Sequence, residues 1–397
     1  MKIYGTGDLH LGQSMNYGST DDSGYPDKLR EQKVMLADFI SNAISDKADM
    51  VVFAGDYFPK HYRINPDAMR VFSEQVLRLV DAGIPVKILE GNHDKARVEA
   101  LDSTVRMIAI FKPDGVEVIS KPCVQMHDEV NIVYIPHLIP AELSRYQKLA
   151  SDGVSEAMKN VVNELMLKID AEKPTILFGH FGIAEAGRGS ESTMIAGNNI
   201  CVSAIIFDRP DLDYCFLGHI HKSWTWKGLY TSISYFGSMD RFDFAEANDR
   251  KEYGVITIED DSVSYDTTCV AARKFVDIKH YMGQSESISF LKQYDVQDAV
   301  VKVAVEVDKN FKGGKKIVDE IKSHLLFSGA YHVHAVNLLF KPTFVAKNAK
   351  VVETASVEDN LQRVLLDEKF ADVDGLYCIH VGLMREIRLE DDIEAEK

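Results

Sequence analysis

The chain has 397 residues, of which 46% are hydrophobic and 27% are charged. This balance is typical of globular proteins and excludes a disordered chain, a collagen and a coiled coil, and the length predicts two or three domains. The net charge of −16 disfavours a nonspecific nucleic-acid coat. It does not exclude a nucleic-acid enzyme, because local charge acts within a Debye length of about 8–10 Å.

Two further features of the composition predict a cytoplasmic location. No apolar run approaches the ~20 residues that span a bilayer, and the N-terminus does not resemble a signal peptide. The five cysteines are scattered, odd in number and never spaced as C-x-x-C. This spacing argues against a disulfide framework and a zinc knuckle, so we expect the cysteines to be buried small hydrophobic residues.

The first part of the chain alternates strand-like and helical patterns. Apolar runs predict three buried strands, at 2–6, 50–54 and 85–90. Apolar residues recur at helical spacing between these runs, at 27–45 and 66–82. Asn65 is the expected N-cap of the second helix, with Pro66 at its first position. Strands separated by helices of this length predict β-α-β units and parallel pairing.

The pattern changes in the middle of the chain. Shorter apolar runs predict a more antiparallel group of strands, at 116–119, 124–127 and 131–135. A helix is expected at 154–169, and strands at 175–178 and 214–217. Mixed strands continue over 224–258.

A small α+β unit is expected from about residue 272. A strand at 300–307, a helix at 315–326 and a strand at 331–339 follow one another there, with more basic than acidic residues. After a polar linker, two apolar stripes at helical spacing predict a helical tail. The predicted domains are therefore 1–271, 272–345 and 346–397.

Five apolar strands end in glycine followed by polar residues. These turns hold Asp8 and His10 after Gly7, Asp56 after Gly55, Asn92, His93 and Asp94 after Gly91, His180 after Gly179, and His219 and His221 after Gly218. Ligands of open α/β sheets collect at the carboxyl ends of strands, where glycine lets the backbone turn sharply. One sheet edge is therefore expected to gather these polar side chains.

The residue types in these turns match a site for two divalent metals. Imidazole, carboxylate and amide ligands suit manganese, iron or zinc, and two such ions can clamp a phosphoryl group during displacement. Asp56 is the expected bridge between the ions. Ordinary structural roles are expected for the other histidines: His61, His127, His137, His280, His324, His332, His334 and His380.

The ordered motifs resemble the calcineurin-like metallophosphoesterases. They read D-L-H-L-G at 8–12, G-D-Y-F at 55–58, G-N-H-D at 91–94, G-H at 179–180 and G-H-I-H at 218–221. Within this superfamily they are similar to the SbcD and meiotic-recombination-eleven nucleases and their phage counterparts, whereas protein phosphatases show G-D-x-V-D-R-G and G-N-H-E. The segments 237–241 and 252–255 also resemble this branch. The layout covers roughly residues 1–340, and the motif matches are short.

The resemblance implies a role for each matched residue. One metal is held by Asp8, His10, Asp56 and His221, and the second by Asp56, Asn92, His180 and His219. His93 is the catalytic acid beside the scissile phosphate, and Asp94 orients its ring. Many relatives carry a histidine directly after G-D-L-F, where this chain has Pro59. Whether His61 takes that role is open.

The resemblance also implies a fold and an activity. The fold is an α/β protein, a four-layer α/β/β/α sandwich with the small α+β domain as a cap and the helical tail. The activity is that of a Mn²⁺-dependent DNA nuclease, a 3′→5′ exonuclease on duplex ends and an endonuclease on single strands or hairpins. Mg²⁺, Fe²⁺ or Zn²⁺ are alternative metals.

Partners follow from the same resemblance. The protein is expected to act as a homodimer, without a membrane, in DNA repair, recombination or replication. The tail is expected to bind an SbcC-type ABC ATPase. Lys312, Lys315 and Lys316 are candidate DNA contacts, although a solvated turn explains them as well.

Two alternative functions stay open. One is a small-molecule phosphodiesterase or phosphatase on the same fold, and the other is a non-catalytic scaffold, against which the complete ligand set argues.

Overall fold

The computed structural model describes residues 1–13, 20, 26–60, 64–95, 103, 105–106, 114–148, 153–186, 200–285 and 287–340. The chain forms two compact units. The first comprises Met1–His280, Glu286–Val305 and Gly313–Leu338. The second comprises Tyr281–Ser285, Glu306–Lys312 and the chain from Leu339 onward. In the second unit, the Tyr281 hydroxyl donates to Asp308 Oδ1 at 2.9 Å.

The first sheet of the larger unit has the strand order β14-β13-β1-β2-β3-β4. Its strands are β1 (Lys2–Thr6), β2 (Met50–Phe53), β3 (Val86–Leu89), β4 (Val116–Ile119), β13 (Glu252–Glu259) and β14 (Ser262–Cys269). Strands β1 to β4 are parallel, and β13 and β14 add antiparallel strands beside β1. The parallel order brings the carboxyl ends of β1, β2 and β3 to one edge.

The second sheet has the order β11-β12-β10-β7-β6-β5. Its strands are β5 (Cys123–Met126), β6 (Asn131–Ile135), β7 (Thr175–His180), β10 (Tyr214–Gly218), β11 (Trp224–Lys227) and β12 (Ser232–Tyr235). The four central strands are parallel, and β5 and β11 are antiparallel edges. A two-stranded ribbon joins β8 (Gly182–Ile183) to β9 (Cys201–Val202).

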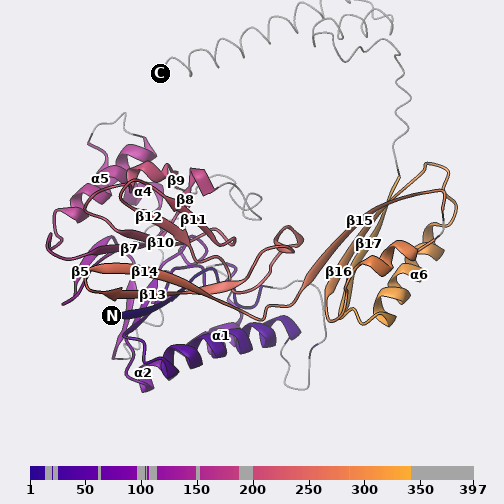
Figure 1. Ribbon diagram of the computed structural model, residues 1–397, viewed down its shortest axis with the longest axis horizontal. Helices are drawn as coiled ribbons and strands as arrows, with labels where there is room; N and C mark the ends of the chain where they lie inside the picture. Colours follow the sequence, from indigo (N-terminus) through magenta and orange to yellow (C-terminus); the bar gives the residue numbers. More distant parts are fainter. Residues whose placement is uncertain are drawn as a thin grey trace, which may run out of the picture. The chain divides into compact units, whose positions relative to one another are not determined.

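Helices cover the outer faces of both sheets, so that four layers result (Figure 1). They are α1 (Asp27–Ser45) and α2 (Pro66–Asp81) on the first sheet, and α4 (Pro140–Leu143) and α5 (Val154–Met166) on the second. Alternation along β2 shows the reason: Val51 and Phe53 pack in the helix-covered core, while Met50 and Val52 pack in the core between the sheets. The predicted α/β sandwich is confirmed.

Short 3₁₀ turns complete the larger unit. They are η1 (Ser144–Tyr146), η2 (Ala184–Ala186), η4 (Ala204–Ile206), η5 (Phe244–Glu246) and η6 (Ser289–Gln293). In the described residues no helix is both long enough and apolar enough to cross a membrane. Among the cysteines, Cys215 is buried as expected, but Cys201 and Cys269 are exposed.

A three-stranded sheet follows the sandwich. It contains β15 (Phe275–Gly283), β16 (Val300–Val307) and β17 (His332–Phe340) in that order, and α6 (Gly314–Phe327) lies beside β16 and β17 (Figure 1). Strand β15 was not predicted from the sequence. The α6 helix buries Ile317, Ile321 and Leu325 at helical spacing. The boundaries at 271 and 345 stay a prediction, and the tail 346–397 lies outside the described residues.

Within the larger unit, α1 holds the start of this sheet. The Arg273 guanidinium pairs with Glu31 of α1 at 2.6 Å and with Asp298 at 2.6 Å. It also lies 3.6 Å from the centre of the Tyr331 ring. The Tyr331 hydroxyl in turn donates to Asp27 at the start of α1. These contacts tie the beginning of β15 and the approach to β17 to the sandwich.

Candidate metal centre

The strand-end turns of both sheets bring their polar side chains together. Three groups of potential ligands have their donor atoms within 4.8 Å of one another: Asp8 with His10 and His221, His10 with Asp56 and His93, and Asp56 with His180 and His219. The turns after β1, β2 and β3 supply one side, and β7 with the turn after β10 supplies the other. The two sheets therefore meet at one common site.

Asp56 lies at the centre of this arrangement. Its Oδ2 is 3.4 Å from His180 Nε2 and 3.9 Å from His10 Nε2, and its Oδ1 accepts the backbone N–H of His93 at 2.8 Å. The carboxylate thus belongs to two of the three groups. This position is the one that a bridging ligand between two metal ions requires.

Each side of Asp56 presents potential donor atoms that lie close to one another. On one side, His10 Nε2 and His221 Nε2 are 3.1 Å apart. On the other, Asn92 Oδ1 lies 2.9 Å from both His180 Nε2 and His219 Nδ1. Imidazole nitrogens with carboxylate and amide oxygens are the donor set of borderline-hard divalent cations, so these residues fit two such ions.

Hydrogen bonds to the backbone orient several of these side chains. His180 Nδ1 lies 2.6 Å from the Ala54 carbonyl oxygen, which turns Nε2 toward Asp56. The Asp8 carboxylate accepts the His219 N–H at 2.9 and 3.0 Å. Such outer contacts fix the tautomer and direction of a metal ligand.

The electrostatics favour positive charge near Asp56. Burial alone would raise the pKa of Asp56, but the His180 and His93 rings hold it well below its usual range. Burial lowers the pKa of His180, yet the Asp56 charge outweighs this effect and raises the pKa to about 9. Burial also lowers the pKa of His219 to about 3, which keeps that ring neutral and able to coordinate.

The backbone at this site is unusual. Asp8, His10, Asp56 and His219 have φ angles of 52°, 41°, 58° and 102°, which non-glycine residues rarely adopt. The neighbouring glycines allow close approach, and Gly55 also has a positive φ of 95°. A Cβ on Gly91 would overlap the Asp56 carboxylate, and one on Gly55 would overlap the His180 ring. Strain concentrated in this way is characteristic of functional sites.

Asp94 is placed differently from the expectation. Its carboxylate accepts backbone N–H groups of Asp56 at 2.7 Å, Tyr57 at 3.0 Å and Gly91 at 2.9 Å. The His93 Nδ1 instead lies 2.6 Å from the Pro59 carbonyl oxygen. Asp94 therefore braces the two turns that carry Asp56 and Asn92, and Pro59 orients the His93 ring. His61 lies outside the described residues.

Two residues lie near the site although the sequence did not predict them there. Glu246 Oε1 lies 3.1 Å from His221 Nδ1, and the His137 ring centre is 6.5 Å from that of His180. Glu246 falls between the segments 237–241 and 252–255, so their resemblance pointed to its neighbourhood. His332 and His334 belong to no such ligand group in the described part of the chain.

Comparison with known proteins defines the class to which this fold and site belong. The family model of the calcineurin-like phosphoesterases matches residues 1–223, and the chain belongs to that family. Membership implies a metal-dependent phosphoester hydrolase that uses divalent ions. The family predicted from the motifs is thereby confirmed.

The chain is also similar to individual proteins of known identity. The SbcD subunit of the SbcCD nuclease of Staphylococcus epidermidis (strain ATCC 12228 / FDA PCI 1200) is 26% identical over 270 residues, covering 67% of this chain and 68% of that protein. A dimetal phosphatase from Danio rerio is 11% identical, covering 67% of this chain and 95% of its own, with a TM-score of 0.42. A purple acid phosphatase from yellow lupin (Lupinus luteus) seeds is 12% identical, covering 68% and 53%, with a TM-score of 0.44.

Proposed function

We propose that this protein is a DNA nuclease that depends on two divalent metals, with Mn²⁺ as the metal used. The observation that carries the proposal is the pair of ligand groups sharing Asp56, with His93 beside them at partial exposure. The similarity to a nuclease subunit supports DNA as the substrate. We expect 3′→5′ exonuclease activity on duplex ends and endonuclease activity on single strands or hairpins.

The grouping of the donor atoms supports the ligand assignment that we propose. Asp8, His10, Asp56 and His221 would hold one ion, and Asp56, Asn92, His180 and His219 the other. When bound, the two ions act as Lewis acids toward phosphoryl oxygens and orient the substrate.

His93 performs the proton chemistry in this proposal. Its ring centre is 4.8 Å from that of His10, and the side chain is only partly buried, so it faces the approach to the ligand groups. With Nδ1 at the Pro59 carbonyl, Nε2 is the atom left to donate to the leaving oxygen of a phosphodiester. Asp94 supports this role indirectly, through the turn that carries His93.

The lysines at the start of α6 are the proposed DNA contacts. Lys312, Lys315 and Lys316 are exposed, and Lys315 and Lys316 lie in the first turn of α6. Cations at a helix N-terminus oppose the helix dipole and cost typically 0.3–1 kcal/mol each. A phosphate at this place offsets that repulsion, because the positive end of the helix dipole and the lysines both favour it.

The proposal also covers the partner, the oligomeric state and the cellular role of the protein. The tail 346–397 binds an SbcC-type ATPase, the protein forms a homodimer, and it acts in the cytoplasm in DNA repair, recombination or replication. The staphylococcal relative is one subunit of a nuclease, and the similarity to it supports such a partnership.

One assay tests the proposed activity. Duplex DNA labelled at the 3′ end, a single-stranded hairpin and a chromogenic phosphodiester are incubated separately with Mn²⁺ or Mg²⁺. We expect release of labelled nucleotides and hairpin cleavage with Mn²⁺. Cleavage of the chromogenic ester without cleavage of either DNA would instead identify a small-molecule phosphodiesterase, and no hydrolysis of any substrate would identify a scaffold.

A further inference from the structure

The two ring nitrogens of His221 face different partners. Nε2 points into the ligand group, 3.1 Å from His10 Nε2, while Nδ1 lies 3.1 Å from Glu246 Oε1. Both side chains are almost fully buried. A carboxylate can only accept a hydrogen bond, so Glu246 favours the proton on Nδ1 and leaves the Nε2 lone pair directed into the ligand group.

A buried lysine holds the carboxylate in this position. Lys251 Nζ donates to Glu246 Oε2 at 2.7 Å, to Ser238 Oγ at 2.8 Å and to the His221 carbonyl at 3.3 Å. Burial would raise the pKa of Glu246, but the hydrogen bond from His221 and the charge of Lys251 hold it well below its usual range. Glu246 therefore has Oε1 at His221 Nδ1, while its Oε2 accepts from Lys251 and, at 3.3 Å, from the Phe242 N–H.

The backbone that carries Glu246 is also fixed. Glu246 ends the η5 turn, whose N-cap Asp243 accepts the Ala245 N–H at 2.7 Å. The Arg241 guanidinium donates to the carbonyls of Glu246 at 3.2 Å and Asp249 at 2.7 Å. The segment 237–241, which pointed to the family, therefore serves to place the η5 turn.

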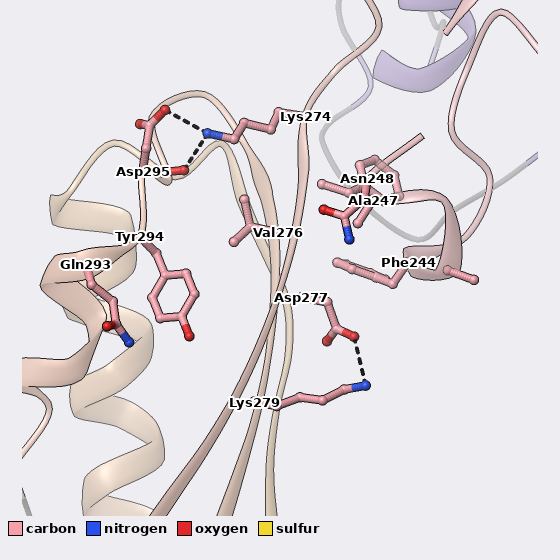
Figure 2. A pocket seen from close by; sticks show the side chains of 12 residues that line it. Phe244, Ala247, Asn248, Lys274, Val276, Asp277, Lys279, Gln293, Tyr294 and Asp295 are labelled. Carbon is pink, nitrogen blue, oxygen red and sulfur yellow. Dashed lines mark hydrogen bonds and ion pairs between the residues drawn. The ribbon is translucent and has the colours of Figure 1, made fainter. Parts of the chain in front are cut away.

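The opposite side of η5 borders a polar groove. Figure 2 shows Phe244 in this groove with Asn248, Asp277 and Lys279. The Phe244 ring centre lies 5.0 Å from that of Phe275, and Lys302 Nζ lies 5.4 Å from the Phe244 ring centre. One short turn thus joins the start of β15 to the candidate metal centre.

We propose that Glu246 is a positioning residue, which sets the tautomer and direction of His221 for metal binding, and that Lys251 keeps its carboxylate in place. This inference goes beyond the proposed nuclease activity and rests on the part of it that makes His221 a ligand.

The Glu246→Gln variant tests the inference. Glutamine has one acceptor and one donor group at the same place. Lys251 competes for the acceptor oxygen, so the amide NH₂ is left to donate to His221 Nδ1, and the ring proton moves to Nε2. We expect the Nδ1–H tautomer of His221 to be lost in NMR spectra of the metal-free protein. We also expect Mn²⁺ affinity, measured by calorimetry, to fall roughly 10–100-fold.

A second variant separates positioning from general damage. In Glu246→Gln/Lys251→Met the competing ammonium is gone and the longer Phe242 N–H contact, 3.3 Å in the native protein, remains, so the amide oxygen can turn back to His221 Nδ1. We expect the Nδ1–H tautomer and most of the Mn²⁺ affinity to return. Failure of this rescue in a folded double variant would overturn the role of Lys251, and unchanged tautomer and affinity in Glu246→Gln would overturn the role of Glu246.

Glu252→Gln is the matched control. Glu252 is a buried glutamate of the same segment, and it accepts a hydrogen bond from Ser223 at 2.6 Å rather than from a candidate ligand. In this variant we expect the NMR signals of the His221 tautomer and the Mn²⁺ affinity to match those of the native protein. A loss of Mn²⁺ affinity equal to that of Glu246→Gln would contradict a specific role of Glu246. Both readouts work without DNA cleavage, so a failure of the proposed nuclease activity remains distinguishable. Full Mn²⁺ affinity in His221→Ala would remove the basis of the inference.

Discussion

Asp56 and His93 differ in what their side chains touch, although both belong to the same group of potential ligands. Asp56 is buried between the two groups of potential donor atoms. His93 is partly exposed, and its backbone, rather than its ring, bonds to Asp56. A ligand shared by two ions and a group that transfers a proton to substrate are expected to occupy just these two kinds of position.

The two roles predict different losses on substitution. We expect His93→Asn to keep both metal ions and to lose turnover by roughly 10²–10⁴-fold, the usual contribution of a positioned acid. We expect Asp56→Ala to lose the ions themselves. Elemental analysis of the purified variants, beside the cleavage assay, separates the two effects. Full metal occupancy in Asp56→Ala would contradict the bridging assignment.

At the scale of the elements, the ends of the strands carry the functional constraints. Gly91 lies two residues after the end of β3, and a methyl group there would overlap the Asp56 carboxylate. Gly314 begins α6, and a methyl group there would meet only Leu338 Cδ1 at 3.8 Å, an ordinary contact. Gly91 is therefore expected to be required for the candidate metal site, whereas Gly314 is expected to tolerate a side chain.

This contrast predicts opposite outcomes for one kind of substitution. Gly91→Ala displaces the Asp56 carboxylate, so we expect weaker Mn²⁺ binding and reduced cleavage. Gly314→Ala lowers the backbone entropy of the unfolded chain, so we expect a gain of about 0.4–1 kcal/mol in unfolding free energy. Calorimetric Mn²⁺ titration and urea unfolding of both variants check these results. Native Mn²⁺ affinity in Gly91→Ala would show that the turn can adjust.

The start of α6 yields a prediction about DNA binding. Replacing Lys312, Lys315 and Lys316 with alanine removes the three charges that are the proposed phosphate contacts. We expect the slope of log K against log salt to become shallower by roughly 0.9 for each phosphate that is no longer bound. Fluorescence anisotropy with labelled duplex in the presence of EDTA measures the slope without cleavage.

Lys159→Ala provides the control for this measurement, because Lys159 is an exposed lysine on α5 that pairs with Glu156 at 3.6 Å. Its salt slope is expected to equal that of the native protein. An unchanged slope in the triple variant would identify the α6 lysines as an ordinary solvated turn.

At the scale of the whole molecule, the sandwich supplies the candidate metal ligands. All the candidate metal ligands lie in turns or strands between Asp8 and His221, and the hydrophobic cores of this region are closed by α1, α2, α4 and α5. Basal cleavage is therefore expected to depend on this part of the chain, and regulation by a partner on the rest.

Truncation after Lys350 tests this division. We expect the shortened protein to keep Mn²⁺-dependent cleavage of a single-stranded substrate. We expect it to lose co-purification with an SbcC-type ATPase and any ATP-stimulated cleavage of blocked duplex ends. Unfolding on truncation, seen by circular dichroism, or loss of basal cleavage would place the tail in the catalytic core instead.

Most of the described elements were predictable from local patterns. Helix α1 spans Asp27–Ser45, as its apolar spacing indicated, and Asn65 caps α2 by accepting the Asp67 N–H at 2.8 Å. Helix α5 ends at Met166, three residues before the expected end at Ile169. The last residue of a helix is harder to predict than the presence of the helix, because a helix can end at any of several neighbouring residues with similar free energy.

The candidate ligands were also predictable, because residue type and strand position are both local properties. Parallel strands connected by helices place their carboxyl ends at one edge, so glycine followed by Asp or His at those ends already points to a shared site. Which residues orient the ligands could not be predicted in the same way. Glu246 reaches His221 from 25 residues further along the chain, and Pro59, rather than Asp94, meets His93 from 34 residues away. Such pairings depend on how the turns pack against one another, and periodicities of 2 and 3.6 residues contain no information about that packing.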